Sequence, residues 1–316
     1  MKLLKLVPDN TNLDFMRWRN LALILSIIAT VASLALVGVK GLNLGVDFIG
    51  GQMIRTTFAQ PVDVEQLRSR VGALGVGEAS IQEFGGPRSY QIRLPRPEGG
   101  EAAANAVASQ VRGMLQQQYQ GARIDAVETV SGKVSEELAT DGALAIALAM
   151  LGIAVYIWFR FEWQFGVGAL ATLFHDVSMI FGFFAITQYQ VDLNIVAAFL
   201  AIVGYSLNDT VVIYDRIREN LRKYRKMAIV PLLNLSLNET LSRTIVTSLS
   251  IMLALGMLLI FGPDVIFGLT LAILLGTFIG TYSSIYISAP ILVWLGVKPD
   301  SFLRVEDENA PGPQAA

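Results

Sequence analysis

One carboxylate stands inside a long apolar stretch of this 316-residue sequence. Asp209, with Asn208 and Thr210 beside it, is followed by three more apolar residues, 211–213, before the next charge at Asp215. An ionisable side chain costs several kcal/mol inside a membrane, so such residues are functional candidates there. A carboxylate in this setting must be protonated or paired with a cation. The stretch therefore predicts a buried protonatable site.

A cation at similar depth is found on the next apolar stretch. Counting about 1.5 Å per helical residue, Asp209 lies about 9 Å from the centre of its stretch and Arg243 about 12 Å from the centre of the next, toward the same side. Thr247 lies one turn from Arg243 on the same helix face. We expect a buried protonatable site at Asp209 and Asn208 that Arg243 can face, with Thr247 beside the arginine. The alternative is that Arg243 extends to the membrane surface while Asp209 caps a fraying helix end.

His175 and Asp176 lie near the middle of the third apolar stretch. Protonatable groups at mid-membrane depth are typical of a proton relay, so both are added to that site. Because adjacent residues point about 100° apart on a helix, we expect that they do not both line one narrow path. The alternative is a hydrogen-bonded structural pair between helices.

Other chemistry is disfavoured by the composition. An intramembrane aspartyl protease needs two carboxylates facing each other, whereas Asp176 and Asp209 differ by about 10 Å in depth. The chain has no cysteine and one histidine, so thiolate sites are excluded and His175 cannot build a zinc site by itself. The net charge of −2 offers no strong attraction for nucleic acid. We expect a protein without metal or cofactor that is not an enzyme.

Six apolar stretches are long enough to position these groups inside a membrane. The chain is 53% hydrophobic and 16% charged, against about 25% charged residues in soluble domains. A spanning helix needs about 20 mostly apolar residues. The first stretch begins some 20 residues into the chain and has no convincing cleavage site, which favours a retained anchor over a signal peptide. The predicted spans are 21–39, 143–159, 163–187, 193–214, 241–261 and 265–295.

Lysine and arginine predict the orientation of these spans. They are concentrated before the first span and in the loop 215–240, and are absent from the loops after the third and fifth spans. Cytoplasmic loops carry this excess. We therefore expect a cytoplasmic N-terminal segment 1–20, a bundle of the later spans at 141–295, and a cytoplasmic tail 296–316 whose last residues are unstructured. Both termini then lie in the cytoplasm.

The segment 40–140 is correspondingly predicted to lie outside, in the periplasm. It holds both acidic and basic residues and alternates between strand-like and helix-like patterns. The order of these patterns is β-α-β-β-α-β, the split βαβ arrangement of ferredoxin-like domains. The expected fold is thus a membrane α-helical bundle of six transmembrane helices with a small α+β periplasmic domain.

Several motifs resemble those of the SecF family, which belongs to the SecD/SecF group of the RND superfamily. They are "DFMRWR" before the first span, "GVDFIGG" after it, "HDV" in the third, "GYSLNDTVVIYDRIREN" in the fourth, and a Leu-Ser-Arg-Thr start to the fifth. The resemblance extends over residues 13–295. Ile49 departs from the family pattern, where Thr is frequent.

The resemblance implies a subunit that pairs with SecD, associates with the SecYEG channel and uses the proton motive force to assist translocation of unfolded preprotein. The positions of Asp209, Arg243 and Thr247 match the family's proton-passage residues. Membrane lipid is a further expected partner. The alternatives are half of an RND-type exporter of small or lipidic molecules, and a purely structural scaffold.

A hinge is expected where the first span meets the outer module. The motif consists of Asp47, Phe48, Gly50 and Gly51. The paired glycines permit a backbone bend that residues with a side chain do not readily adopt. We expect this bend to connect the first span to a moving outer module.

Overall fold

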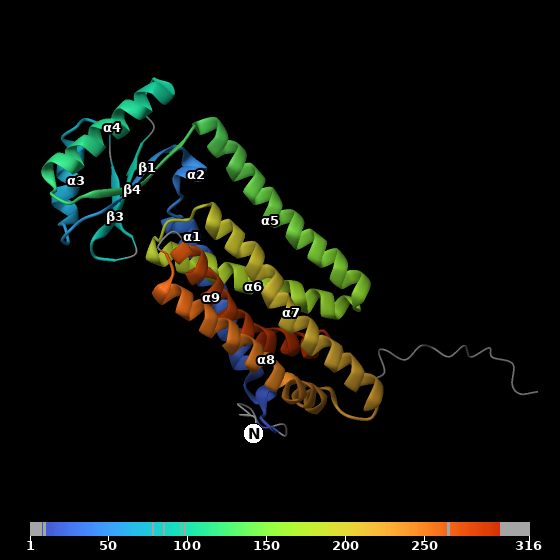
Figure 1. The fold of residues 1–316 in the computed structure, drawn as a ribbon. Helices are drawn as coiled ribbons and strands as arrows, with labels where there is room; N and C mark the ends of the chain where they lie inside the picture. Colours follow the sequence, from blue (N-terminus) through green and yellow to red (C-terminus); the bar gives the residue numbers. More distant parts are fainter. Residues whose placement is uncertain are drawn as a thin grey trace, which may run out of the picture.

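The computed structural model describes residues 8, 11–77, 79–84, 86–95, 97, 99–263 and 266–297. Most of the expected C-terminal tail lies outside these residues. Figure 1 shows two parts, a bundle of long helices and a small α+β domain at one end of it. We call this end of the bundle the domain end and the opposite end the distal end.

Six helices within the described residues are long and apolar enough to cross a membrane, which confirms the predicted number of spans. Three of them, α5, α7 and α8, continue beyond their apolar stretches. A π-helical segment, η3 (Ser284–Ser288), interrupts the last. The six are η1–α1 (Phe15–Trp18 and Arg19–Lys40), α5 (Gly132–Arg160), α6 (Trp163–Thr187), α7 (Leu193–Lys223), α8 (Ile229–Phe261) and α9–η3–α10 (Phe267–Ser283, Ser284–Ser288, Ala289–Trp294).

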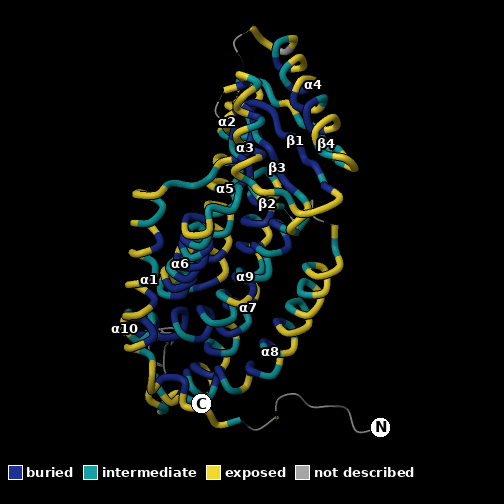
Figure 2. Tube along the Cα trace, turned by 90° about the vertical axis from the view of Figure 1, so that its left-hand side faces the viewer, coloured by how far each residue is buried: buried dark blue, intermediate teal, exposed yellow. Residues whose placement is uncertain are grey.

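Helices α6, α7 and α9 form the centre of the bundle, while α1, α5 and α8 surround them. Figure 2 shows buried positions concentrated in the central helices. Small residues on α9 allow close approach to α7. A Cβ atom on Gly276 would lie 2.5 Å from Ile202 Cγ1, and one on Gly280 would lie 3.3 Å from Ser206 Cβ. The contact between α7 and α9 thus depends on glycine.

The α+β domain has one four-stranded sheet with two helices on one face. Adjacent strands are antiparallel in the order β2-β3-β1-β4. Ile54 and Ile92 on one face of the sheet join a core with Leu67 and Val111 from the helices. Side chains alternate along a strand, so Gln91 falls on the opposite face. The elements are β1 (Gly51–Thr57), α3 (Val64–Gly72), β2 (Ser80–Glu83), β3 (Ser89–Leu94), α4 (Gly100–Gln118) and β4 (Arg123–Val130).

The domain contacts the bundle through polar side chains of β3. Gln91 donates to the Gln190 side chain in the loop between α6 and α7. Arg93 donates to Asn43 Oδ1 at 3.2 Å and to the carbonyl oxygen of Leu44. The chain itself makes two further links, one through α2 (Val46–Ile49) into β1 and one from β4 into α5.

Gly50 and Gly51 both have a positive φ, 73° and 116°. At Gly50 ψ is 173°, a region used almost only by glycine and costing about 1–3 kcal/mol for other residues. We therefore expect Gly50→Ala to lower the midpoint of thermal unfolding in detergent.

Gly113 provides the matched control for Gly50→Ala. It lies inside helix α4, and a Cβ atom there would meet nothing within 4 Å. Gly113→Ala should raise the stability by about 0.5–1 kcal/mol, because alanine is the better helix former. A Gly50→Ala protein that is as stable as the wild type would contradict the strain described here.

Candidate functional site

Asp176 is the most completely buried carboxylate of the bundle, with 0% of its surface exposed. His175 Nδ1 lies 2.8 Å from Asp176 Oδ1. The hydroxyls of Ser206 and Ser283 donate to Asp176 Oδ2 at 2.5 and 2.8 Å. Because a buried charge is costly unless hydrogen-bonded, these contacts explain how the carboxylate is accommodated. They join helices α6, α7 and α9.

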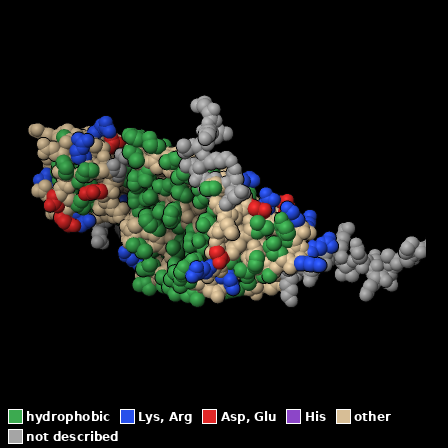
Figure 3. All heavy atoms as spheres, turned by 90° about the horizontal axis from the view of Figure 1, so that it is seen from below, with side chains coloured by type: hydrophobic (Ala, Val, Ile, Leu, Met, Phe, Trp, Pro, Cys, Tyr) green, Lys and Arg blue, Asp and Glu red, His purple; other side chains and the backbone are tan. Residues whose placement is uncertain are grey.

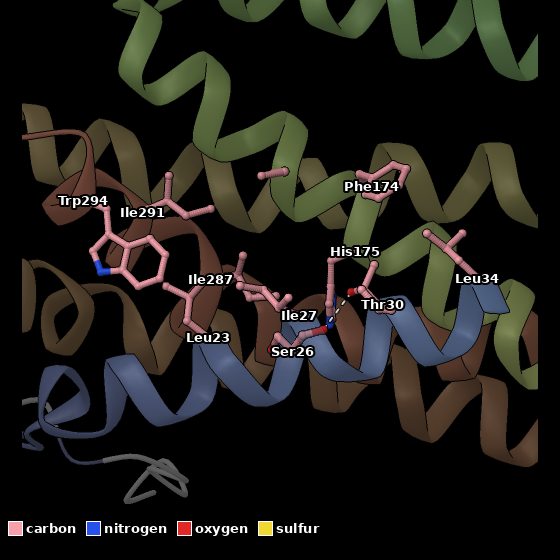
Figure 4. Close-up of a pocket in the computed structure, with 12 residues that line it drawn as sticks. Leu23, Ser26, Ile27, Thr30, Leu34, Phe174, His175, Ile287, Ile291 and Trp294 are labelled. Atoms are coloured by element: carbon pink, nitrogen blue, oxygen red, sulfur yellow. Dashed lines mark hydrogen bonds between the residues drawn. The ribbon is translucent and has the colours of Figure 1, made fainter. Parts of the chain in front are cut away.

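His175 has turned toward Asp176, although we expected the adjacent side chains to diverge. Adjacent residues leave a helix in directions about 100° apart, but the two side chains bend toward each other. Both residues therefore belong to one cluster. His175 also lines a cavity of about 430 Å³ enclosed by α1, α6 and the η3–α10 segment, beside Ser26 and Thr30 (Figure 4). The other lining residues are almost all apolar.

Asp209 lies in a second polar cluster that joins α7, α8 and α9. It is buried, with 4% of its surface exposed. The Ser248 hydroxyl donates to Asp209 Oδ2 at 3.4 Å, a long hydrogen bond. Ser248 Oγ in turn accepts from Thr281 Oγ1 at 2.8 Å and from the Tyr205 hydroxyl at 3.3 Å. This carboxylate therefore has fewer and weaker donors than Asp176.

The two clusters are one helical turn apart along α7. Ser206, which holds Asp176, precedes Asp209 by three residues, or about 4.5 Å of rise. Thr210, next to Asp209, donates to the carbonyl oxygen of Ser206 at 3.2 Å. A displacement of α7 would therefore act on both clusters.

The predicted partners of Asp209 are placed differently from the expectation. In the described part of the chain, no ion pair within 4 Å joins Asp209 to Arg243, although Arg243 lies close enough for its charge to act on the carboxylate. Arg243 is exposed, and Thr247 donates to the Arg243 carbonyl oxygen at 2.9 Å. Asn208 is also exposed. Among the described residues, none of these three hydrogen-bonds to the Asp209 carboxylate.

Ser248 is the partner that the sequence reasoning missed. Residues that face the bundle interior along α8 include Leu237, Leu241, Thr244 and Ser248, spaced four, three and four residues apart. This spacing marks one helix face. The same pattern, applied to α8, would have selected Ser248 rather than Thr247 as the residue directed toward α7.

Asp47 of the hinge motif contacts the helix that carries Asp209. Asp47 Oδ2 accepts a hydrogen bond from the backbone N–H of Leu193, the first residue of α7, at 3.0 Å. Asp192 accepts from the N–H of Ile195 at 3.0 Å. Two carboxylates thus cap one helix N-terminus, where the helix dipole favours negative charge. Phe48 packs beside them against a cluster that includes Ile195.

Comparison with known proteins assigns a family to this arrangement. The family model "Protein export membrane protein SecD/SecF, C-terminal" matches residues 110–298, and "SecD/SecF GG Motif" matches residues 35–62. The chain belongs to the SecD/SecF family. The matched GG segment contains Asp47, Phe48, Gly50 and Gly51.

Curated relatives match nearly the whole SecD/SecF-type chain. Protein translocase subunit SecF of Pseudomonas aeruginosa is 42% identical over 295 residues, covering 92% of this chain and 94% of the relative. The subunit of the same name from Cereibacter sphaeroides is 44% identical over 300 residues, covering 93% of each. With its six apolar helices, the chain is a multi-pass protein of the bacterial inner membrane.

Two solved SecDF structures share the fold. The crystal structure of SecDF from Thermus thermophilus superposes with a TM-score of 0.85 at 31% identity, covering 92% of this chain and 40% of that one. A SecDF structure in a super-membrane-facing form gives a TM-score of 0.65 at 33% identity, covering 91% and 39%. This SecD/SecF-family chain thus spans about two fifths of the SecDF chains.

Two acidic residues at the domain end, Asp192 and Glu128, have raised pKa values. Burial raises the pKa of Asp192 above its ordinary value of 3.8, and the charge of Asp47 raises it further, against hydrogen bonds from Ile195 and Asn194 that lower it. Burial likewise raises the pKa of Glu128, against the nearby charge of Arg55, whose Nη1 lies 3.4 Å from Glu128 Oε1. Folding therefore makes both groups weaker acids than they are in the unfolded chain.

A pH-dependent stability follows from Asp192. The pKa of Asp192 is higher in the folded than in the unfolded chain. The contribution of Asp192 to the free energy of unfolding is therefore most favourable below pH 3.8, and it is lost as the pH rises through the folded-state pKa. Asp192→Asn removes this loss. The unfolding midpoint of the variant, relative to the wild type, should therefore increase as the pH is raised through this window. A difference between the two proteins that is constant with pH would contradict the assignment.

Proposed function

We propose that this chain is a SecF subunit that couples proton movement through the membrane to the translocation of unfolded protein on the Sec pathway. The observation that carries the proposal is the buried Asp209 carboxylate, held by one long hydrogen bond between α7 and α8. The side chains do not specify what is transported. The relatives named protein translocase subunit SecF support a protein as the cargo. The chain acts as an accessory subunit without catalytic chemistry of its own.

Protonation of Asp209 changes the forces between α7 and α8. The neutral carboxyl group loses its attraction to the nearby charge of Arg243, and the hydrogen bond from Ser248 weakens because it no longer has a charged acceptor. Both changes loosen α8 relative to α7. Loss of the proton restores the attraction, so each protonation cycle shifts the two helices apart and together.

Asp176 has a different role in this proposal. Its three polar partners come from α6, α7 and α9 and favour the structural alternative considered for the His175–Asp176 pair. Asp176 then holds the three central helices together while Asp209 exchanges its proton. His175 completes this clamp from within the same helix.

The hinge motif connects α7 to the α+β domain. Asp47 caps the first turn of α7, and three residues later Gly50 and Gly51 lead into β1. A shift of α7 therefore displaces the segment on which the domain is mounted. The two SecDF structures superpose unequally on this chain, with TM-scores of 0.85 and 0.65 at nearly equal coverage.

The energy available per proton sets the scale of this motion. A charge that crosses 100 mV yields about 2.3 kcal/mol, which changes a two-state equilibrium by about fifty-fold. A bias of this size suits a rocking motion between two states of similar free energy. The ferredoxin-like α+β domain is then the moving element.

The proposed orientation places the α+β domain in the periplasm and the distal end in the cytoplasm, with both termini cytoplasmic. The four tryptophans support a membrane interface at the distal end, because all are at least 55% exposed there and indole rings favour that depth. They are Trp18, Trp158, Trp163 and Trp294.

A SecD subunit is the proposed partner within the membrane. Arg243 and Asn208 are exposed on spanning helices, where lipid would leave an arginine and an amide without polar contacts. A second bundle that covers α7 and α8 would supply those contacts. The resulting SecD–SecF unit is proposed to act beside the SecYEG channel, with the periplasmic domain contacting preprotein.

The test is translocation into inner-membrane vesicles depleted of this chain. Restoring the chain together with SecD should restore the stimulation of preprotein translocation by an imposed proton gradient. If translocation is equally fast without the chain, the proposal is wrong. Transport of a labelled lipid or drug by the reconstituted chain without Sec components would instead favour an RND-type exporter.

A further inference from the structure

An apolar cleft lies between α5 and α6 near the distal end. It has a volume of about 650 Å³ and is lined on one side by α5 and on the other by α6. Trp158 and Phe159 on α5 are 79% and 88% exposed, and Trp163 on α6 is 60% exposed. The lining is composed of apolar residues and one glycine, Gly166. The cleft is thus suited to a hydrocarbon chain.

A basic hollow lies directly beside this cleft. Arg160, the residue after Phe159, lines it together with residues of α7, and its volume is about 520 Å³. Two adjacent residues at the end of α5, Phe159 and Arg160, thus line the cleft and the hollow respectively. On the face seen in Figure 3, a broad hydrophobic area covers the middle of the bundle, and lysine and arginine side chains, with some acidic ones, gather farther toward the distal end.

The charges of the basic hollow are only partly neutralised. Arg160 pairs with Asp215 at 2.7 Å, and Arg218 pairs with Glu162 at 3.2 Å. Within the described residues, neither Arg222 nor Lys223 forms an ion pair closer than 4 Å. These two exposed cations border the hollow, whose lining also includes Glu219, itself paired with Arg216. The Lys223 ammonium lies 5.0 Å from the centre of the Tyr224 ring and is open to solvent on its other sides. The hollow therefore keeps an excess of positive charge for an anionic ligand.

We propose that the α5–α6 hairpin binds an anionic phospholipid. Its phosphate occupies the basic hollow beside Arg222 and Lys223, and an acyl chain occupies the apolar cleft. Trp158 and Trp163 lie at the boundary between the two, which is the depth that tryptophan favours at a membrane interface. Basic clusters next to a spanning helix attract anionic headgroups in this way.

The bound lipid acts on the helix that leads to the α+β domain. Helix α5 begins at Gly132, directly after β4, and makes few contacts with the rest of the bundle. A lipid chain between α5 and α6 fills the cleft and fixes the separation of these helices at the distal end. The lipid site stands on its own geometry and does not depend on the proton step proposed above.

Tryptophan fluorescence tests this site directly. The full chain is reconstituted in phosphatidylcholine bilayers that contain a small fraction of lipid with brominated acyl chains, which quench nearby indole rings. Brominated phosphatidylglycerol should quench more strongly than brominated phosphatidylcholine at the same fraction. The excess quenching should disappear in a Trp158→Phe, Trp163→Phe double variant, because Trp18 and Trp294 lie outside the cleft.

Two matched charge variants identify the headgroup site. Arg222→Gln with Lys223→Gln removes two cations of the hollow from the last turn of α7. Arg225→Gln with Lys226→Gln removes the same residue types from the segment that follows α7, outside the hollow. The first pair should weaken phosphatidylglycerol binding about thirty-fold, at about five-fold per charge, while the second should retain most of it.

Any of three results would overturn the proposal. Equal quenching by the two brominated lipids would exclude a headgroup preference. Equal losses in the two charge variants would indicate diffuse attraction to the surface instead of a site. Undiminished excess quenching in the double tryptophan variant would place the acyl chain elsewhere.

Discussion

Replacing Asp209 with Asn should abolish the stimulation of protein translocation by a proton gradient while leaving the fold intact. The amide has nearly the size of the carboxyl group, and its oxygen still accepts the hydrogen bond from Ser248. It cannot gain or lose a proton at physiological pH. Translocation into vesicles that contain the variant and SecD should therefore equal the rate measured without an imposed gradient.

Asp215→Asn is the matched control for this substitution. Asp215 lies on the same helix, but it is exposed at the distal end and paired with Arg160. Loss of one surface ion pair costs at most about 1 kcal/mol, so stimulation should be close to that of the wild type. Equal stimulation in the Asp209→Asn and Asp215→Asn proteins would exclude Asp209 as the proton carrier.

Locking the α+β domain to the bundle should also abolish the stimulation. Gln91 on β3 and Gln190 in the α6–α7 loop are in direct side-chain contact. Cysteines at these two positions can be joined by a short thiol-reactive reagent with a reducible link. The natural chain has no cysteine, so the reaction is confined to the introduced pair. Reduction of the link should restore the stimulation.

The control for the lock is a cross-link inside the domain. Gln52 on β1 is paired with Thr129 on β4, and their side chains are hydrogen-bonded at 3.2 Å. Cysteines at these positions link two neighbouring strands without fixing the domain to the bundle. Full stimulation is expected with this link. Full stimulation with the Gln91–Gln190 link as well would contradict a moving domain.

The sequence was sufficient to predict the number of spans and the order of strands and helices in the α+β domain. A helix that spans a bilayer requires about 20 apolar residues. Such a run is visible in the sequence without knowledge of how the helices pack. The β-α-β-β-α-β order was also readable, because period-2 and helical patterns alternate with turn residues between β1 and β4.

The rotation of each helix about its axis was harder to predict. The depth of each residue in the membrane predicted that Arg243 and Thr247 lie near Asp209. In the structure, α8 packs with Ser248 directed toward α7, and Ser248 makes the hydrogen bond to Asp209. Side-chain torsions likewise brought His175 and Asp176 together. The contact of Asp47 with Leu193 joins positions 146 residues apart, for which a single sequence carries no signal.

If Asp209 carries protons through the membrane, the proton flux across reconstituted vesicles must depend on this residue. The chain and SecD are reconstituted into vesicles that contain a pH-sensitive dye, and a membrane potential is imposed. We predict a steady proton flux with the wild-type chain and a flux equal to that of protein-free vesicles with the Asp209→Asn variant. A flux in the variant equal to that of the wild type would exclude Asp209 as the residue that carries the protons.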